Sequence, residues 1–228
     1  AATTLVPSLT NDNTPNYTFS SNEAGTITYG GNCSSSTTAA AADNNTITFN
    51  ALGDAQHANC TITVRDNAGN TSSTLDVNSF TIDTTAPSLS RVTAVSTPDN
   101  DSTPSYTFSS NEAGVITYSG GCGSSSSSAT SGNNAVILTQ SDNSTALSDG
   151  TYNCTIRVTD NASNTSNALS VTQFIIDTTG PTVAEVTAVT TPGNDTTPRY
   201  IFSSNEAGDI TYGGSCSSSD NSSTASNN

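Results

Sequence analysis

The chain lacks several residue types that most globular proteins use. It contains no tryptophan, methionine or lysine, and its basic residues are four arginines and one histidine. Only 32% of its 228 residues are hydrophobic and 6% are aromatic, so any core must be thin. No apolar run is long enough to cross a bilayer and no signal-peptide pattern is present, so we expect no membrane insertion.

The charge balance excludes further partners. Acidic residues number 19 and the formal net charge is −15. Such a surface repels nucleic acid and anionic membranes, so we expect the chain to bind neither. The same surface attracts divalent cations, and Asp-rich loops bordered by Asn and Gly offer the oxygen ligands that calcium prefers. Calcium is therefore the one cofactor that the composition suggests.

One stretch, Thr-Pro-x-Tyr-x-Phe-Ser-Ser-Asn-Glu-Ala-Gly, occurs three times. Its copies begin at Thr14, Thr103 and Thr197, so the spacings are 89 and 94 residues. A repeat of this length indicates tandem copies of one folding unit. We expect module one at residues 1–86, module two at 87–180, and the first half of module three at 181–228. We also expect the chain to be part of a longer polypeptide, because the third copy stops within a module.

The five cysteines follow the repeat. Cys33 and Cys60 lie in module one, Cys122 and Cys154 lie at the matching places in module two, and Cys216 lies in the partial module. The counts fit one pair in each complete module, with the partner of Cys216 beyond the chain end. Repeated structural pairs are typical of oxidising compartments, so we expect an extracellular or cell-surface location.

Short alternating segments predict an all-β fold. Tyr17 and Phe19 alternate with polar residues, which is the period of a half-buried strand. We expect a tight turn ending at Gly25 with a positive φ, and a single last strand over residues 75–82. About seven such strands per module, separated by Gly, Asn, Asp and Pro turns, predict tandem antiparallel β-sandwiches of immunoglobulin type.

Three short motifs also resemble a known family. Asp-Thr-Thr-Ala-Pro after module one, Asn-Glu-Ala-Gly in the first hairpin and Asp-Asn-Ala-Gly-Asn before the last strand resemble bacterial Ig-like repeats of large secreted adhesins and surface proteins. The chain departs from antibody domains, since it has no core tryptophan and places its cysteines differently. The resemblance implies a stalk or spacer arranged as an elongated rod, and not an enzyme.

The immunoglobulin topology suggests how the cysteines pair. Cys33 follows the strand near residues 26–29, and Cys60 begins the strand near residues 60–64. These two strands are antiparallel neighbours of one sheet in this topology, so the two cysteines meet at one edge. We therefore predict the bonds Cys33–Cys60 and Cys122–Cys154, each contributing roughly 3–4 kcal/mol in the loop-entropy model.

The same topology gathers acidic turns at the ends of modules, where clustered carboxylates and amides could hold calcium. The candidates at the first junction are Asp12, Asp83, Glu112, Asp160 and Asn161. Those at the second junction are Asp99, Asp101, Asp177 and Glu206. Asp and Asn also favour turns because their side chains bond nearby backbone N–H groups, and this explanation, which needs no ion, is preferred.

No pattern of residues suggests catalysis. His57 is the single histidine, falls outside the repeated plan, and is expected to be solvated. The leading hypothesis is a spacer segment of an extracellular fibre or adhesin stalk, whose partners are the neighbouring modules. Two alternatives remain: a filament subunit that assembles with copies of itself, and a module that binds a surface glycan or protein.

Overall fold

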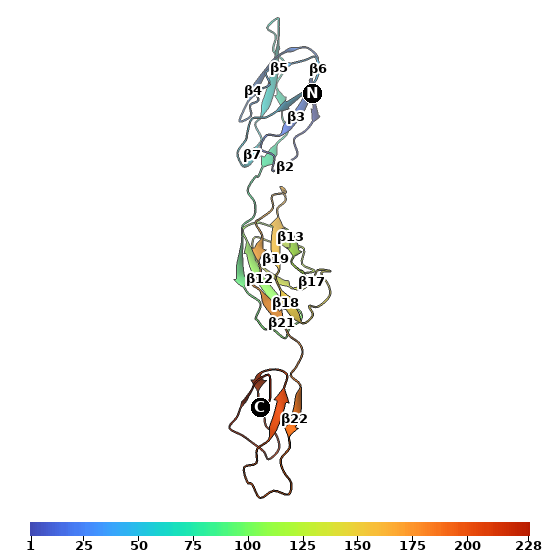
Figure 1. Ribbon diagram of the computed structural model, residues 1–228. Coiled ribbons are helices and arrows are strands. Elements are labelled where there is room, and N and C mark those ends of the chain that lie inside the picture. Colours follow the sequence, from blue (N-terminus) through green and yellow to red (C-terminus); the bar gives the residue numbers. More distant parts are fainter. The chain divides into compact units, whose positions relative to one another are not determined.

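The computed structural model describes all 228 residues and consists of short β-strands joined by turns (Figure 1). It contains no helix long and apolar enough to cross a membrane. The chain divides into two compact units, Ala1–Ile176 and Asp177–Asn228, and we call the second one the C-terminal unit. The first unit holds two separate hydrophobic cores, one in module one and one in module two.

Module one contains three sheets of hydrogen-bonded strands. The first is ordered β1-β3-β6, the second β2-β10-β7 and the third β5-β4-β8-β9. The strands are β1 (Ala2–Thr4), β2 (Leu9–Thr10), β3 (Asn16–Ser21), β4 (Gly25–Gly30), β5 (Ala39–Ala40), β6 (Asp43–Thr48), β7 (Ala55–His57), β8 (Thr61–Asp66), β9 (Leu75–Asp76) and β10 (Phe80–Ile82). Most pairs are antiparallel, but β10 runs parallel to β2.

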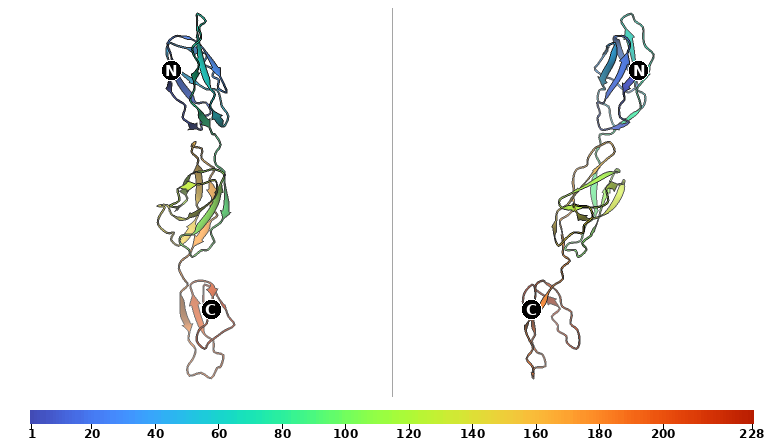
Figure 2. Two further views of the ribbon diagram at one scale, coloured as in Figure 1. Left: turned by 180° about the vertical axis from the view of Figure 1, so that it is seen from behind. Right: turned by 90° about the vertical axis from the view of Figure 1, so that its right-hand side faces the viewer.

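Module two repeats this plan, with sheets ordered β11-β12-β16 and β15-β13-β19-β20 and the pairs β14-β17 and β18-β21 (Figure 2). Its strands are β11 (Leu89–Thr93), β12 (Ser105–Ser110), β13 (Gly114–Ser119), β14 (Cys122–Gly123), β15 (Ser128–Ala129), β16 (Gly132–Ile137), β17 (Thr139–Gln140), β18 (Gly150–Tyr152), β19 (Thr155–Thr159), β20 (Leu169–Ser170) and β21 (Phe174–Ile176). Both modules are Ig-like, all-β domains in tandem, in agreement with the predicted fold class.

The cores consist of the residues that alternate in the sequence. In β3, Tyr17 and Phe19 are buried while the residues between them are less so, and β12 repeats this with Tyr106 and Phe108. The opposite layer is supplied by the later strands, for example by Ile62 in β8. Because the two modules bury matching residues, one sequence pattern specifies both cores.

Two sequence predictions about strands are wrong. The strands before and after the Asn-Glu-Ala-Gly turn were expected to form a hairpin, but β3 and β4 lie in different sheets. Residues 75–82 form two strands, since β9 pairs with β8 whereas β10 pairs with β2 and β7. The chain changes sheet at Asn78, whose side-chain amide donates to Val6 O at 2.8 Å and whose oxygen accepts from Val6 N at 3.2 Å. These bonds hold Val6 to the point where the chain crosses between sheets.

The prediction about Gly25 is also wrong. Gly25 is not among the residues with positive φ, and it opens β4 opposite Asp66 of β8. A Cβ at this position would lie 2.3 Å from Arg65 O, and Gly114 of module two has the same relation to Thr159 O. Glycine is needed here because two backbones approach closely, and not because the turn requires an unusual φ.

The C-terminal unit contains two antiparallel sheets of two strands each. β22 (Val183–Thr187) pairs with β23 (Ile201–Ser204), and β24 (Gly208–Asp209) pairs with β25 (Ser222–Ser223). These pairs correspond in sequence to β11-β12 and β13-β15 of module two. The two modules and the C-terminal unit follow the repeat, and the domain boundaries at residues 86 and 180 stay predictions.

Candidate functional site

One disulfide joins the two halves of each complete module. Cys33 bonds Cys60 across a Cα–Cα distance of 5.2 Å, and Cys122 bonds Cys154 across 5.6 Å. All four residues are buried, and each belongs to its module's core cluster. The pairs are those named from the sequence, and two structural disulfides fit an oxidising compartment. Cys216 is a free, exposed thiol.

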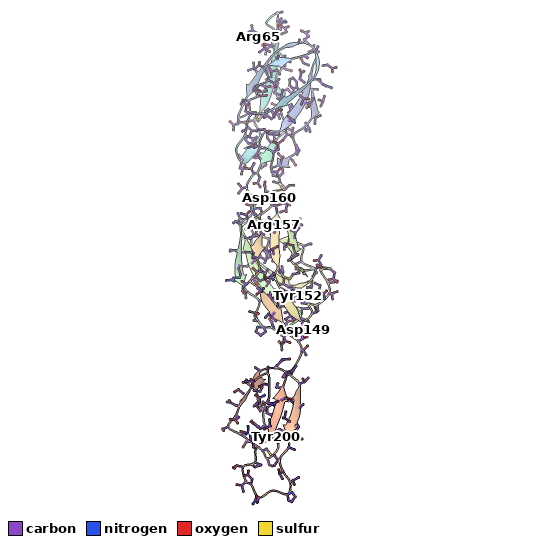
Figure 3. The ribbon with its side chains drawn as sticks, viewed as in Figure 1. Arg65, Asp149, Tyr152, Arg157, Asp160 and Tyr200 are labelled. Atoms are coloured by element: carbon purple, nitrogen blue, oxygen red, sulfur yellow. A yellow bond between two sulfur atoms is a disulfide. The ribbon has the colours of Figure 1, made fainter.

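An acidic cluster lies where module one ends and module two begins. Carboxylate oxygens of Asp83, Glu112 and Asp160 all lie within 4.8 Å of one another. Asp83 directly follows β10, Glu112 lies in the turn between β12 and β13, and Asp160 directly follows β19. Asp83 and Glu112 are half-buried and Asp160 is buried, and Asp160 lies at one end of module two (Figure 3). Three of the five residues predicted for this junction therefore meet.

Asn164 links the cluster together. Its side-chain amide donates to Asp83 O at 2.8 Å and to Asp160 Oδ2 at 3.0 Å, while its backbone N donates to Asp160 Oδ1 at 2.9 Å. Asn161, which was predicted from the sequence in this place, is exposed. The sequence did contain a sign of this role, because the motif Asp-Asn-Ala-x-Asn occurs in both modules. In module one its last residue, Asn70, makes the same two bonds to Asp66.

The electrostatics of the cluster are unfavourable without a counter-charge. Partial burial, followed by the negative charges of Asp83 and Asp160, raises the pKa of Glu112 above its ordinary value. Asn111 Nδ2 donates to Glu112 Oε1 at 3.2 Å and offsets part of this effect. The cluster thus gathers negative charge that a cation would neutralise.

The other acidic candidates are engaged in their own turns. Asp12 accepts from Thr14 N at 2.9 Å and Thr14 Oγ1 at 3.1 Å, and Asp101 accepts from Thr103 in the same way at 2.8 and 3.0 Å. Asp99 accepts from Asp101 N at 3.1 Å. These are the local bonds from Asp side chains to nearby backbone N–H groups that are expected in turns.

The two remaining candidates belong to the C-terminal unit. Asp177 accepts from Thr179 N at 3.2 Å, and Glu206 Oε1 accepts from Asn205 Nδ2 at 3.2 Å. Both bonds are again local to a turn. A second-junction site formed by Asp99, Asp101, Asp177 and Glu206 stays a prediction.

Asp54 holds the segment that leaves module one, a role that the sequence analysis missed. Its Oδ1 accepts from Thr84 N at 3.0 Å and Thr84 Oγ1 at 2.8 Å, and its Oδ2 accepts from Thr85 Oγ1 at 2.7 Å. These bonds, led by that from Thr85, hold the pKa of Asp54 below its ordinary value. The Asp-Thr-Thr motif is therefore tied back to the loop before β7.

The expectation for His57 is wrong, because the residue is buried and belongs to the repeated plan. Its ring stacks on Phe80 at a centroid distance of 5.3 Å, and Nε2 lies 3.0 Å from Gly53 O. In module two, Tyr152 stacks on Phe174 at 5.5 Å and its hydroxyl donates to Ser148 O at 2.9 Å. Both rings thus cover a core phenylalanine and bond the carbonyl four residues earlier, as in a tyrosine corner.

Module two also has a surface cavity beside its disulfide. It has a volume of about 350 Å³ and is lined by Tyr118, Gly120, Cys122 and residues of the loop after β17, including Ser141 and Asn143. That loop contains the extra residues that make module two longer than module one. Hydroxyl and amide groups therefore meet an aromatic ring at this place.

Comparison with known proteins gives a family. The family model described as "Bacterial Ig-like domain" matches residues 5–84 and again residues 92–178, which together exceed half of the chain. A solved structure described as "D0-D1 domain of Intimin" is 17% identical over 73% of this chain and 93% of that chain, with a TM-score of 0.25. At this level the structural similarity supports no argument. No match was found among curated proteins.

Proposed function

Because the chain belongs to the bacterial Ig-like domain family, we propose that it is a spacer segment of a long extracellular fibre or adhesin stalk. One observation carries this proposal: modules one and two each have a separate core built from matching residues. Tyr17 and Phe19 in one module and Tyr106 and Phe108 in the other are all buried. A chain of self-contained modules can be lengthened by adding copies without changing any core, which suits a spacer.

Bonds at the two ends of module one support a role in carrying tension. In module one the last strand, β10, pairs with β2 near the start and with β7. Asp54 then holds Thr84 and Thr85 after that strand. A pull on the chain ends must therefore break paired strands and these side-chain bonds together before the core opens.

Solution scattering tests the spacer proposal. A variant in which module two, residues 87–180, is present twice should have a maximum dimension larger by on the order of 30 Å, the length of a strand of eight to ten residues. The chain as it stands is the control. If the radius of gyration of the longer variant rises only as much as it would for a compact sphere of the same mass, the spacer proposal is contradicted.

We further propose that calcium stiffens the junction at Asp83, Glu112 and Asp160. Their carboxylates lie within 4.8 Å of one another, and partial burial, followed by the charges of Asp83 and Asp160, raises the pKa of Glu112. Calcium takes six to eight oxygen ligands, and turn carbonyls and water would supply the rest. A cation here would join the chain leaving module one to two turns of module two.

Calcium titration of the full chain, followed by melting, tests this second proposal. Ligand present at a hundred times its dissociation constant stabilises by about 2.7 kcal/mol, so the melting temperature should rise with calcium and fall with chelator. Glu112→Gln combined with Asp83→Asn should abolish the rise, whereas Glu23→Gln, at the matching position of module one, should not. An equal calcium response in all three chains would contradict the site.

A second candidate function is glycan binding by module two. The cavity beside Cys122 favours it, because an aromatic ring and several hydroxyl and amide groups line a volume of about 350 Å³. A glycan array probed with the full chain, and with Tyr118→Ala as the matched variant, tests it. Binding that disappears in the variant supports this function, and no binding leaves the spacer proposal as it stands.

A further inference from the structure

Module two leaves one long strand edge open. β16 pairs with β12 in the sheet ordered β11-β12-β16, and no strand pairs with its other side. It spans six residues, Gly132–Ile137, in unbroken register with β12. The side chains of Asn133, Ala135 and Ile137 are exposed, and that of Ile137 is 47% exposed although it is large and apolar. A strand edge of this length and exposure can pair with a further strand.

The register of β16 determines which backbone groups face outward. Leu138 N, directly after the strand, donates to Pro104 O at 2.9 Å. Because N–H groups alternate in direction along an antiparallel strand, those of residues 132, 134 and 136 also point toward β12. The N–H and C=O groups of Asn133, Ala135 and Ile137 therefore point away from the sheet. Three donors and three acceptors thus form one row at the open edge.

The other edges of the two main sheets in module two are protected. In the sheet ordered β15-β13-β19-β20, both edge strands, β15 and β20, have only two residues. At the other edge of the sheet that contains β16, β11 carries Arg91, and its register with β12 shifts between Arg91 and Thr93. Short strands, charges and irregular register are means by which proteins prevent pairing at sheet edges. β16 has no charge, no proline and no shift in register, so it is the exception.

The matching strand of module one differs at the same edge. β6 begins with Asp43 where β16 begins with Gly132, so β6 places a carboxylate beside its edge. The last residue of β6 is Thr48, whereas β16 ends with the apolar Ile137. The two strands hold equivalent places in their sheets. One topology therefore carries a charged, polar edge in module one and an uncharged, more apolar edge in module two.

Charge favours a second copy of this chain as the partner. The chain has a net charge of −15, so two copies repel each other over most of their surface. The sheet β11-β12-β16 contains no acidic residue, and Arg91 is its single charged residue. Two copies can therefore meet along this sheet without bringing carboxylates together. A cationic partner would instead be attracted to the acidic turns.

The sequence of β16 is also complementary to itself. In an antiparallel pair of two β16 strands related by a two-fold axis, Ala135 lies opposite Ala135 and Asn133 lies opposite Ile137. These are the residues whose backbone groups face outward, so each opposed pair can exchange both of its hydrogen bonds. No like charges meet across the pair. Two sheets of three strands would become one sheet of six.

From these features we propose that β16 is a pairing edge at which two copies of the chain join side by side through module two. Each copy contributes one short strand, so the contact belongs to the weak, reversible class of interfaces. It forms no covalent bond and needs no metal. This inference does not depend on the spacer proposal, but in a fibre it would join neighbouring stalks laterally.

Sedimentation velocity of the full chain over a range of concentrations tests the pairing. Every chain carries Cys216→Ser and is measured in chelator, so that neither intermolecular disulfides nor bridging cations contribute. The chain with unchanged β16 should show a monomer–dimer equilibrium. This equilibrium should shift toward the dimer as salt is added, because salt screens the repulsion between two acidic chains. A monomer at every concentration and salt level would overturn the proposal.

Substitutions at the two-fold axis locate the contact. Ala135→Pro removes the outward N–H without removing a bond to β12, so it should abolish the dimer and leave the melting temperature nearly unchanged. Thr46→Lys, at the matching position of β6 in module one, is the control and should dimerise like the unchanged chain. Equal dimerisation of the unchanged chain and Ala135→Pro would overturn the proposal.

A pair of opposite charges separates loss of the contact from loss of folding. Ala135→Asp and Ala135→Lys each place like charges opposite one another, so each variant alone should dimerise up to about fivefold more weakly. An equimolar mixture of the two should recover the dimer, because opposite charges then face each other across the axis. This recovery requires that both variants are folded. A mixture that dimerises no better than either variant alone would contradict the proposed register.

Amide hydrogen exchange gives a second measurement at single residues. As the protein concentration rises, exchange at Asn133, Ala135 and Ile137 should slow on the order of tenfold, because these amides become bonded in the dimer. Exchange at Asn134 and Val136 should not change, since their N–H groups already face β12. Dimers in which the first three amides exchange as fast as in the monomer would indicate a contact elsewhere and overturn the proposal.

Discussion

Module two and the C-terminal unit carry the same repeated stretch, but its residues differ in burial. Ser110 Oγ donates to Glu112 O at 2.6 Å, and Ser204 Oγ donates to Glu206 O at the same distance. The turns are therefore equivalent, yet Tyr106 is fully buried and Tyr200 is 50% exposed. Local sequence thus specifies the turn between the two strands, whereas the core depends on strands from the second half of the module.

The largest contrast is expected for core phenylalanines. Phe108→Ala should destabilise module two by about 3–5 kcal/mol, because Phe108 is fully buried. Phe202→Ala should cost far less, because Phe202 is only half-buried. Urea unfolding followed by hydrogen exchange of each region checks both. Similar losses of unfolding free energy for Phe108→Ala and Phe202→Ala would contradict the difference in burial between the two regions.

The next contrast is between the disulfide of module two and the free thiol of the C-terminal unit. Removing the second disulfide with Cys122→Ser and Cys154→Ser should cost module two about 3–4 kcal/mol, since its loop spans 32 residues. Cys216→Ser should leave stability unchanged, because that thiol is free and exposed. The same urea series compares the variants. A large loss from Cys216→Ser would indicate a bond that the structure does not contain.

Alanine in place of the matching residues Gly114 and Gly208 should also affect the stability of the two regions differently. Gly114→Ala places a Cβ 2.3 Å from Thr159 O, so overpacking should cost about 1–3 kcal/mol. Gly208→Ala meets nothing within 4 Å and should change stability by less than about 0.5 kcal/mol. Thermal melting measures both. A neutral Gly114→Ala would show that β13 and β19 can move apart easily.

Tyr152 lies in the half of module two for which the C-terminal unit has no counterpart. Tyr152→Phe removes its bond to Ser148 O and keeps the stacking on Phe174, so it should cost about 0.5–1.5 kcal/mol. The control is Tyr200→Phe, which should matter less because Tyr200 is 50% exposed. The urea midpoints of the two variants give the measurement. An unchanged midpoint for Tyr152→Phe would show that the bond from Tyr152 to Ser148 O does not stabilise module two.

The smallest effect is expected at Glu112, measured in chelator. Burial and the charges of Asp83 and Asp160 raise the pKa of Glu112 in the folded state, so its ionised form opposes folding. That opposition is present above the folded pKa and disappears as the pH falls through it. Glu112→Gln should therefore stabilise module two at neutral pH, by less than about 0.5 kcal/mol, and remove this pH dependence.

A matched substitution, Glu206→Gln, checks the origin of this effect. Glu206 makes the same local bond to its preceding Asn as Glu112 does. Melting curves between neutral and mildly acidic pH should differ from those of the unchanged chain for Glu112→Gln alone. Equal shifts for both variants would locate the effect in the turn and not in the acidic cluster.

Much of the fold was predictable because the repeat makes the alternation visible. Tyr17 and Phe19 mark a buried strand in both sequence and structure, and the cysteine pairs follow from the topology. The change of sheet at Asn78 was not predictable, because it depends on a side-chain bond to Val6, which is remote in sequence.

The candidate site was predictable only in part. Asp83, Glu112 and Asp160 were placed together by topology, whereas the choice between Asn161 and Asn164 depended on which amide faces Asp83. The role of His57 was missed because one extra residue separates it from the following cysteine, which obscures its match to Tyr152. Because of this one-residue difference, comparing residue spacings does not align His57 with Tyr152. Only the stacking of each ring on a core phenylalanine shows that they match.

The most direct test of the spacer account is to stretch single molecules of the full chain under oxidising and then reducing conditions. The account predicts two separate unfolding events, one for each complete module. Reduction should lengthen them by roughly 90 and 110 Å, the extended lengths of the 27- and 32-residue loops that the disulfides close. A single cooperative unfolding event, or extension without any resolved event, would contradict the claim that the two modules unfold independently under force.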